Sequence, residues 1–266
     1  MKVAVIQMNC VTGKKEINFQ IAGELIEKAC EQGAKLIILP ELFNTGYACN
    51  VLDWELAENE GEETDIFLRK YADEYSCSII GGFVERAKIS GLVYNSLMMV
   101  QTGKKTQVYR KNYLWGSEKN RFIKGTKLEI WQTEQNKIAP QICYEVGFSE
   151  NAKIAALKGA DILIYSSAFG KPRLHIWDIA TKARAIETGC FVLASNHSDV
   201  EGDIAFCGHS RIVDPEGTVL SEAVEDNEMI IADIDLEHTY RQRDQLPYLR
   251  DLNIACIVDG YRSIEK

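Results

Sequence analysis

Apolar residues in this chain recur with two different periods, and the two periods alternate along the sequence. Apolar side chains spaced by four residues from Ile17 to Ala29 predict an amphipathic helix, and Gly33 is placed to end it. A strand at 35–39 follows at once, and its apolar run from Leu36 to Leu39 is typical of a short strand buried on both faces. A helix that leads directly into a buried strand favours an α/β fold.

The same alternation continues to residue 245. Further strands are predicted at 1–8, 78–84, 94–100, 139–142, 191–194 and 229–233, and further helices at 64–75, 173–187 and 236–245. Asp214-Pro215-Glu216-Gly217 has proline second and glycine fourth, which predicts a type I turn in a hairpin. From Leu246 onward the sequence fits no clear element.

One segment of the chain echoes another. The segments 32–38 and 158–164 share Gly-Ala, and in both a helix end leads into an apolar strand. No Ser/Gly-rich linker or break in composition divides the chain, so we expect one domain over 1–266. Two similar halves suit two packed sheets with helices outside.

Composition narrows the class of protein. A chain of 266 residues is long enough to bury a substantial core. A net charge of −9 argues against a nucleic-acid partner. No run of about 18 apolar residues is present, so a membrane span is not expected. The segment 1–8 lacks the features of a signal peptide, and a cytoplasmic location is therefore expected.

The cysteines and histidines give no metal pattern. Eight cysteines are scattered without a Cys-x-x-Cys pair, and the four histidines lack zinc-ligand spacing. We therefore expect reduced thiols, of which seven are structural or incidental, and neither a metal nor a cofactor. The eight are Cys10, Cys30, Cys49, Cys77, Cys143, Cys190, Cys207 and Cys256.

Three polar residues follow strand-like runs and are candidates for chemistry. Glu41 comes after Pro40, where the chain must leave a central sheet, and Lys111 and Cys143 each end another run. Open α/β sheets tend to bind ligands at the carboxyl ends of their strands. A cysteine at such a junction suits a thiolate nucleophile. Taken singly, each residue also has an ordinary interpretation: a buried thiol, an exposed carboxylate, or half of the basic pair Arg110-Lys111.

Together these blocks resemble the nitrilase superfamily, the carbon–nitrogen hydrolases. The matching blocks are Pro40-Glu41, Thr45-Gly46-Tyr47, Arg110-Lys111, Leu114 and Ile142-Cys143-Tyr144-Glu145, in the family's order, with support from 183–187, 194–196 and 208–217. The resemblance covers nearly the whole chain. It implies a four-layer α-β-β-α sandwich and a homodimer or higher homo-oligomer, with the tail from about 246 to 266 packed on a partner subunit.

The resemblance also implies roles for the candidates. Cys143 would attack the carbon of a small amide or carbamoyl substrate and form a thioester, with Glu41 as the base. Lys111 and the Tyr144 backbone N–H would stabilise the oxyanion, which releases ammonia or an amine after collapse. Glu118 resembles a second glutamate that positions substrate in amidase members, although its polar neighbours also suit a solvated turn.

The expected pocket residues, and the positions that differ from the family's usual residues, indicate which substrates are favoured. Candidate substrate-binding residues are Tyr47, Trp115, Tyr144, Phe169 and Asn196, although aromatic residues also fill cores and asparagine also caps turns. Many members of the family have histidine at the position of Tyr113. True nitrilases typically have Cys-Trp-Glu at the nucleophile, so Cys143-Tyr144-Glu145 favours amide or carbamoyl substrates over nitriles.

Two other functions stay open at this stage. A Cys–His hydrolase could use His197 or His209, since such sets assemble in space rather than along the chain. That alternative leaves Glu41 and Lys111 without a role. A nitrile-hydrolysing member of the same superfamily is the other alternative. An interaction module without activity is disfavoured because the Glu, Lys and Cys set is intact.

Overall fold

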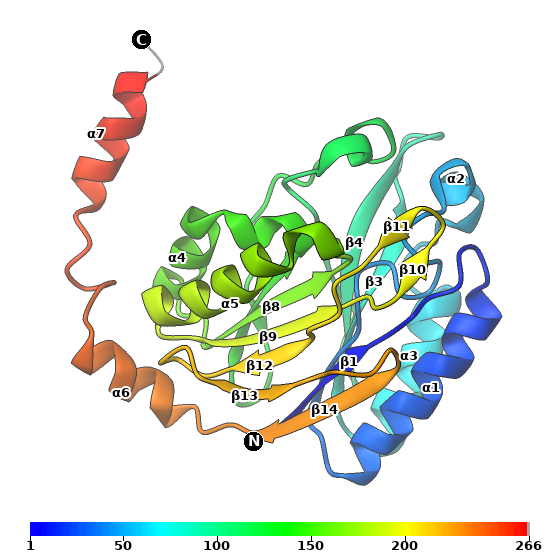
Figure 1. Cartoon of the computed structure of the whole chain (residues 1–266), viewed down its shortest axis with the longest axis horizontal. Coiled ribbons are helices and arrows are strands. Elements are labelled where there is room, and N and C mark those ends of the chain that lie inside the picture. Colours follow the sequence, from blue (N-terminus) through cyan, green and yellow to red (C-terminus); the bar gives the residue numbers. More distant parts are fainter. Residues whose placement is uncertain (265–266) are drawn as a thin grey trace.

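Two six-stranded sheets pack face to face, with helices on their outer faces (Figure 1). This computed structural model describes residues 1–264. The first sheet comprises, in order, β14 (Glu228–Asp233), β1 (Lys2–Gln7), β2 (Leu36–Ile38), β3 (Ser78–Arg86), β4 (Val93–Gln101) and β5 (Gln107–Arg110). The second comprises β13 (Val219–Glu222), β12 (Arg211–Val213), β9 (Phe191–Asn196), β8 (Ile162–Ser167), β7 (Lys137–Ile142) and β6 (Trp131–Gln132).

Helices complete the four layers. The first sheet is covered by α1 (Lys15–Glu31) and α3 (Glu63–Tyr75), and the second by α4 (Ser149–Leu157) and α5 (Leu174–Thr188). The remaining elements are α2 (Asp53–Leu56), α6 (Glu237–Gln245), α7 (Ile254–Ile264), the hairpin β10 (Val200–Glu201) with β11 (Ile204–Ala205), and four 3₁₀ helices: η1 (Asn50–Leu52), η2 (Gly116–Asn120), η3 (Cys143–Gly147) and η4 (Lys171–Arg173). The predicted α-β-β-α sandwich is therefore confirmed.

The alternation of side chains along the central strands builds two separate apolar layers. In β1, Val3 and Val5 point into the core between the sheets, whereas Ala4 and Ile6 pack against α1 and α3. A strand sends successive side chains to opposite faces, so a strand buried on both faces must be apolar at every position. This explains the unbroken apolar run that the sequence shows around β2.

The repeated Gly-Ala segments end two helices in the same way. Gly33 after α1 and Gly159 after α4 both have positive φ, 84° and 89°. Each donates to the carbonyl three residues back, and the next residue, Ala34 or Ala160, donates to the carbonyl five residues back. This Schellman pattern stops the helix and turns the chain into β2 or β8. Both strands lie between two parallel neighbours, so the echo reflects equivalent positions in the two sheets.

The two sheets are joined where their parallel strands end. Met8 and His197 form a parallel bridge beyond β1 and β9. The Ser166 hydroxyl at the end of β8 donates to the Leu39 carbonyl beyond β2, at 2.8 Å. Residues that follow β2 and β7 are thus brought to the same edge of the sandwich, which positions the candidate site.

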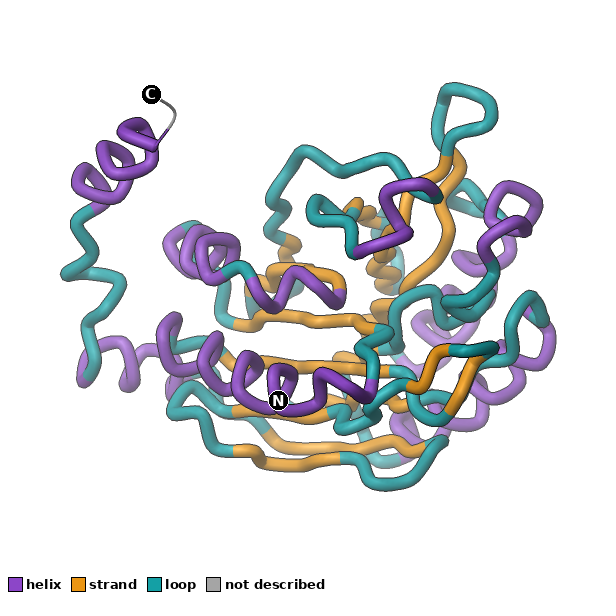
Figure 2. The backbone as a smooth tube through the Cα atoms, turned by 45° about the horizontal axis from the view of Figure 1, so that its top comes forward, coloured by secondary structure: helices purple, strands orange, loops and turns teal. Residues whose placement is uncertain are grey.

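The prediction for the tail was wrong in one respect. Residues 254–264 form the helix α7 rather than an irregular segment, while 265–266 lie outside the described residues. Ile254, Ile257, Val258 and Tyr261 have the spacing of an apolar helix face, but all four are exposed, since α7 extends away from the sheets (Figures 1 and 2). Within the described residues, no helix is both long and apolar enough to cross a membrane.

Candidate active site

Glu41 lies in a turn directly after β2 and is completely buried. Gly82 on the neighbouring strand β3 makes this turn possible, because a Cβ there would lie only 2.4 Å from the Leu42 nitrogen and 2.8 Å from the Glu41 Cα. The Glu41 carboxylate accepts hydrogen bonds from the Asn95 side chain at 2.6 Å and from the Ala168 backbone N–H at 2.8 Å. Its position is therefore fixed by both sheets rather than by solvent.

Lys111 lies between two buried carboxylates. Its Nζ is 2.7 Å from Glu41 Oε1 and 2.8 Å from Glu118 Oε1, and all three side chains are fully buried. Glu118 also accepts from the Tyr47 hydroxyl at 2.7 Å and from the Trp115 N–H at 2.9 Å. Glu118 is thus part of this buried cluster and not of a solvated turn.

The paired carboxylates keep Lys111 charged. Burial acts to lower its pKa, but attraction to Glu118 and Glu41 outweighs burial, and the pKa is raised well above its usual value. An ammonium group has three N–H donors, and the two carboxylates take two of them. Lys111 therefore keeps its positive charge and has one N–H donor left for another acceptor.

Cys143 starts the 3₁₀ helix after β7 and has a φ of +50°, in the left-handed region that is uncommon for residues other than glycine. Burial raises the pKa of its thiol well above the usual value, and the Glu41 carboxylate raises it further. Lys111 and the Ala168 backbone N–H act in the opposite direction. Charges act on a thiol in this way only from nearby, so Cys143 lies in the same buried region as Glu41 and Lys111. The thiol there is neutral, and Glu41 and Lys111 contact each other directly.

A third buried carboxylic acid of the site, Glu145, was not assigned a role from the sequence. Its carboxylate accepts from the Ile142 N–H at 2.7 Å, the Asn112 N–H at 2.8 Å and the Tyr109 hydroxyl at 2.9 Å. Ile142 precedes Cys143, and Asn112 follows Lys111, so this carboxylate joins the two turns. The sequence did contain a signal for this role, because a single acidic residue inside an apolar stretch indicates a buried carboxylate with hydrogen-bond partners.

Glu145 should make stability depend on pH. Burial raises its pKa from 4.5 to about 7. Between these values the folded state holds a proton that the unfolded state has released, so the free energy of unfolding should fall as pH rises, by about 3 kcal/mol in total. Glu145→Gln removes this titration. The free energy of unfolding, measured with denaturant at pH 5 and at pH 8, should fall more for the native protein than for the variant. Equal changes in the two proteins would contradict the assignment.

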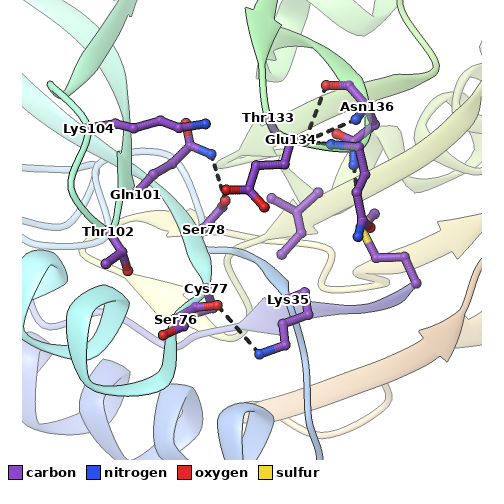
Figure 3. A pocket seen from close by; sticks show the side chains of 13 residues that line it. Lys35, Ser76, Cys77, Ser78, Gln101, Thr102, Lys104, Thr133, Glu134 and Asn136 are labelled. Atoms are coloured by element: carbon purple, nitrogen blue, oxygen red, sulfur yellow. Dashed lines mark hydrogen bonds between the residues drawn. The ribbon is translucent and has the colours of Figure 1, made fainter.

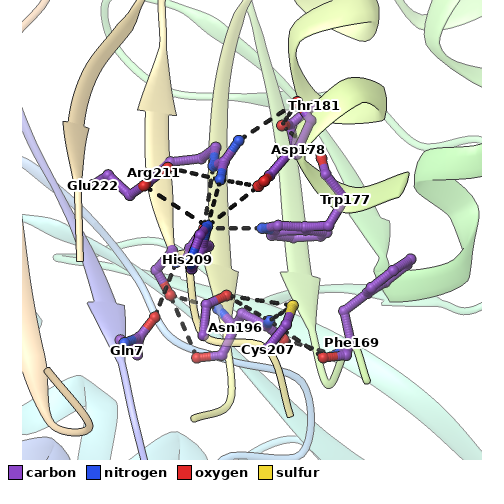
Figure 4. A network of polar contacts seen from close by, with 12 residues as sticks. Gln7, Phe169, Trp177, Asp178, Thr181, Asn196, Cys207, His209, Arg211 and Glu222 are labelled. Atoms are coloured by element: carbon purple, nitrogen blue, oxygen red, sulfur yellow. Dashed lines mark hydrogen bonds and ion pairs between the residues drawn. The ribbon is translucent and has the colours of Figure 1, made fainter. Parts of the chain in front are cut away.

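The predicted substrate-binding residues occupy different positions. Tyr47 is buried beside Glu118, while the Trp115 ring is partly exposed and lies 4.8 Å from the Tyr144 ring, centre to centre. Phe169 is buried against Trp177, and the Asn196 carboxamide accepts from the Phe169 N–H at 2.7 Å. Figure 4 shows Asn196 directed at this backbone, so Asn196 holds the loop after β8 in place.

Tyr113, at the position where many family members have histidine, stacks on Phe148 with ring centres 3.9 Å apart. Its hydroxyl lies 3.4 Å from the Asn151 side chain, at the start of α4. The tyrosine therefore packs one side of the site without joining the charged cluster.

The two histidines proposed as alternatives have other partners. His197 is buried, and its Nε2 is 2.5 Å from the Glu41 backbone carbonyl, so the ring supports the turn that carries Glu41. His209 belongs to a separate network with Asp178, Glu222 and Arg211 (Figure 4). Asp178, His209 and Glu222 have metal-ligand types, but the Arg211 guanidinium pairs with both carboxylates, at 2.6 Å from Glu222. Arginine thus already supplies the positive charge there.

A pocket at the other end of the sandwich is separate from this cluster. Lys35, Ser78, Gln101 and Asn136 are among its lining residues (Figure 3). Lys35 and Ser78 lie at the amino ends of β2 and β3, whereas Glu41 follows the carboxyl end of β2. Sites in parallel sheets form at the carboxyl ends, which favours the cluster around Lys111.

Comparison with known proteins adds to this geometry. The family model described as carbon–nitrogen hydrolase matches residues 2–244. The chain belongs to the carbon–nitrogen hydrolase family. It is 33% identical to the 2-oxoglutaramate amidase of Bacillus subtilis over 253 residues, which is 94% of this chain and 96% of that protein.

Solved structures of carbon–nitrogen hydrolases agree. The Helicobacter pylori member superimposes with a TM-score of 0.90 at 30% identity, covering 100% of this chain and 98% of that one. A Saccharomyces cerevisiae protein of branch 10 of the nitrilase superfamily gives a TM-score of 0.86 at 29% identity, covering 93% and 94%. The resemblance read from the sequence is therefore confirmed at the level of family and fold.

Proposed function

We propose that this carbon–nitrogen hydrolase is an amidase that cleaves a small amide or carbamoyl substrate through a thioester on Cys143. The observation that carries the proposal is the buried Lys111 ammonium, held by Glu41 and Glu118 in the same buried region as the Cys143 thiol. A buried charge cluster of this kind is costly to maintain for structure alone, and perturbed groups gather where chemistry occurs. The whole chain, 1–266, acts as one domain in this proposal.

In the first half of the reaction, Glu41 accepts the Cys143 thiol proton as the sulfur attacks the amide carbon. The carbonyl oxygen becomes negative and is stabilised by the remaining Lys111 N–H and by the Tyr144 backbone N–H. Glu41 then returns the proton to the leaving nitrogen. The carbon–nitrogen bond breaks, ammonia or an amine departs, and a thioester remains on Cys143.

In the second half, water attacks the thioester carbon and Glu41 takes the water's proton. The same Lys111 and Tyr144 donors stabilise the second oxyanion. Collapse of this intermediate breaks the carbon–sulfur bond and releases a carboxylic acid. The expelled Cys143 thiolate regains the proton from Glu41. The Glu118 carboxylate holds the Lys111 ammonium and the Tyr47 hydroxyl in place through both halves.

The test is ammonia release from matched short amides, carbamoyl amines and nitriles. Amides or carbamoyl compounds should be hydrolysed, and a nitrile of the same chain length should not. The relatives' amidase name and the Cys143-Tyr144-Glu145 run support this choice. Faster hydrolysis of the nitrile would favour the nitrile-hydrolysing alternative. His209 lies in the separate Arg211 network, so the proposed mechanism predicts that His209→Ala keeps its activity. Loss of all activity in His209→Ala would instead favour a Cys–His mechanism.

The proposal includes a homodimer in which α7 packs on a second copy of the chain. The apolar face of α7 is exposed in the structure described for residues 1–264, although Tyr261 donates to Glu150 at 2.7 Å. Exposed isoleucines on α4 and α5, among them Ile154 and Ile179, offer a matching surface.

The proposal also includes a cytoplasmic location. All eight cysteines are unpaired, which agrees with a reducing compartment.

Placing a charge on α7 should break this assembly. Ile257→Glu puts a carboxylate on the apolar face, and burying it against a partner without a cation is strongly unfavourable. Light scattering after size-exclusion chromatography should give a dimer for the native chain and a monomer for the variant. Asp259→Asn, also on α7, is the control and should stay dimeric. A native monomer would contradict the proposal.

A further inference from the structure

Arg173 is the last residue of η4, just before α5, and its guanidinium lies over two aromatic rings. Its Cζ is 4.7 Å from the centre of the Trp115 ring and 5.7 Å from that of Phe169. Aromatic faces attract a guanidinium and hold its plane, and they leave the N–H groups on its edge available for hydrogen bonds.

Both rings beneath Arg173 adjoin the reacting groups. Trp115 packs on Tyr144, the residue after Cys143. Phe169 follows Ala168, whose N–H donates to the Glu41 carboxylate at 2.8 Å. The guanidinium is therefore placed by two segments that adjoin the proposed reacting groups, one next to Tyr144 and one next to Glu41.

Arg173 has no acidic partner within the part of the chain that the structure describes: no carboxylate oxygen lies within 4.0 Å of its nitrogens. Arg121 provides a contrast, since it also lies over a site ring, that of Tyr47, at 5.3 Å. Arg121 makes two hydrogen bonds to Asp53, at 2.7 and 2.8 Å. A half-buried guanidinium that is held in place but lacks such a partner is suited to bind a carboxylate from outside.

The charge balance of the site points the same way. The site has two carboxylates, Glu41 and Glu118, and one ammonium, Lys111. Together they leave one net negative charge around the neutral thiol. This charge would repel an anionic substrate unless a cation lies where the anion binds. Arg173 supplies such a cation over Trp115, whose ring packs on Tyr144.

We infer that Arg173 determines specificity by binding an anionic group at the far end of the substrate. The preferred substrate would then be a short chain with an amide at one end and a carboxylate at the other. This inference rests on the proposed amidase function, which it refines. The paired N–H groups of the Arg173 guanidinium would orient the substrate so that the amide carbon meets the Cys143 sulfur.

The experiment compares glutaramate, which carries a terminal carboxylate, with pentanamide, its neutral counterpart of equal chain length. Arg173→Gln should lower kcat/KM for glutaramate by about 10- to 100-fold, mainly through KM, because a hydrogen-bonded charge pair is lost. Turnover of pentanamide should change by less than about twofold. Lys171→Gln removes the same charge from an exposed position on η4 and should leave both substrates unaffected.

A loss of equal size for both amides, or no loss for glutaramate, would overturn the inference. Pentanamide turnover also reports whether the variant is folded. Calorimetric titration of glutaramate into Cys143→Ala and into Cys143→Ala with Arg173→Gln measures binding without turnover, and tighter binding to the first is expected. If the native enzyme hydrolyses no amide and no carbamoyl compound, the proposed function fails, whereas equal binding of glutaramate to the two variants contradicts only the role of Arg173.

Discussion

Replacing Cys143 with alanine is expected to reduce hydrolysis of any amide substrate by at least about 10⁴-fold, since no covalent intermediate can then form. Glu41 and Lys111 stay in place in this variant, because each is held by other partners: Asn95 and Ala168 for Glu41, and Glu118 for Lys111. Steady-state ammonia release measures the loss. The residual rate should not respond to iodoacetamide.

Folding should be largely unaffected by this change. Only one sulfur atom is removed, and thermal unfolding of Cys143→Ala should resemble that of the native chain. Cys77→Ala is a matched control, because Cys77 is also a buried cysteine but lies at the opposite end of the sandwich, before β3. The control should keep its activity. Substantial turnover by Cys143→Ala would end the thioester proposal.

Replacing Lys111 with methionine is expected to damage both activity and stability. Loss of an oxyanion donor should lower kcat by about 10²- to 10³-fold. Removing the ammonium also leaves the Glu41 and Glu118 carboxylates buried without a cation, which typically costs about 3–5 kcal/mol. For a chain of this size the melting temperature should fall by roughly 10 °C.

The pH dependence of the Lys111→Met variant separates this effect from poor packing. The two unpaired acids can bind protons in the folded state, so the loss of stability should grow as pH rises and shrink as pH falls. Lys119→Met, which changes an exposed lysine near Glu118, should alter neither property. A loss of stability that is the same at low and high pH would show that shape, not charge, matters at position 111.

The strands and helix ends could be predicted from the sequence because they depend on local rules, whereas the four-layer sandwich and the roles of Glu41, Lys111 and Cys143 were expected from the family resemblance. Apolar runs mark the strands buried on both faces, and Gly33 and Gly159 mark helix ends. Glu41 and Cys143 follow such runs, and parallel strands bring those positions to one edge. Family resemblance was needed to link them to Lys111, since Lys111 follows a strand at the edge of the sheet.

The other features depend on long-range contacts that no local pattern contains. The carboxylate of Glu145 gains its role from backbone groups about 30 positions earlier, next to Lys111. The half-buried position of Arg173 and its lack of an acidic partner among residues 1–264 emerge only when η2 and η4 come together at Trp115. The helix α7 was missed although its apolar spacing is regular, because that spacing normally faces a core, and here it faces outward.

Mass spectrometry of the enzyme quenched during turnover of a short amide tests the central claim most directly. A mass gain equal to the acyl group is expected on the native chain, and peptide mapping should place it on the peptide that contains Cys143. The gain should disappear in Cys143→Ala and on treatment with hydroxylamine, which cleaves thioesters. An acyl group on any other residue, or an acylated Cys143→Ala variant, would contradict the account.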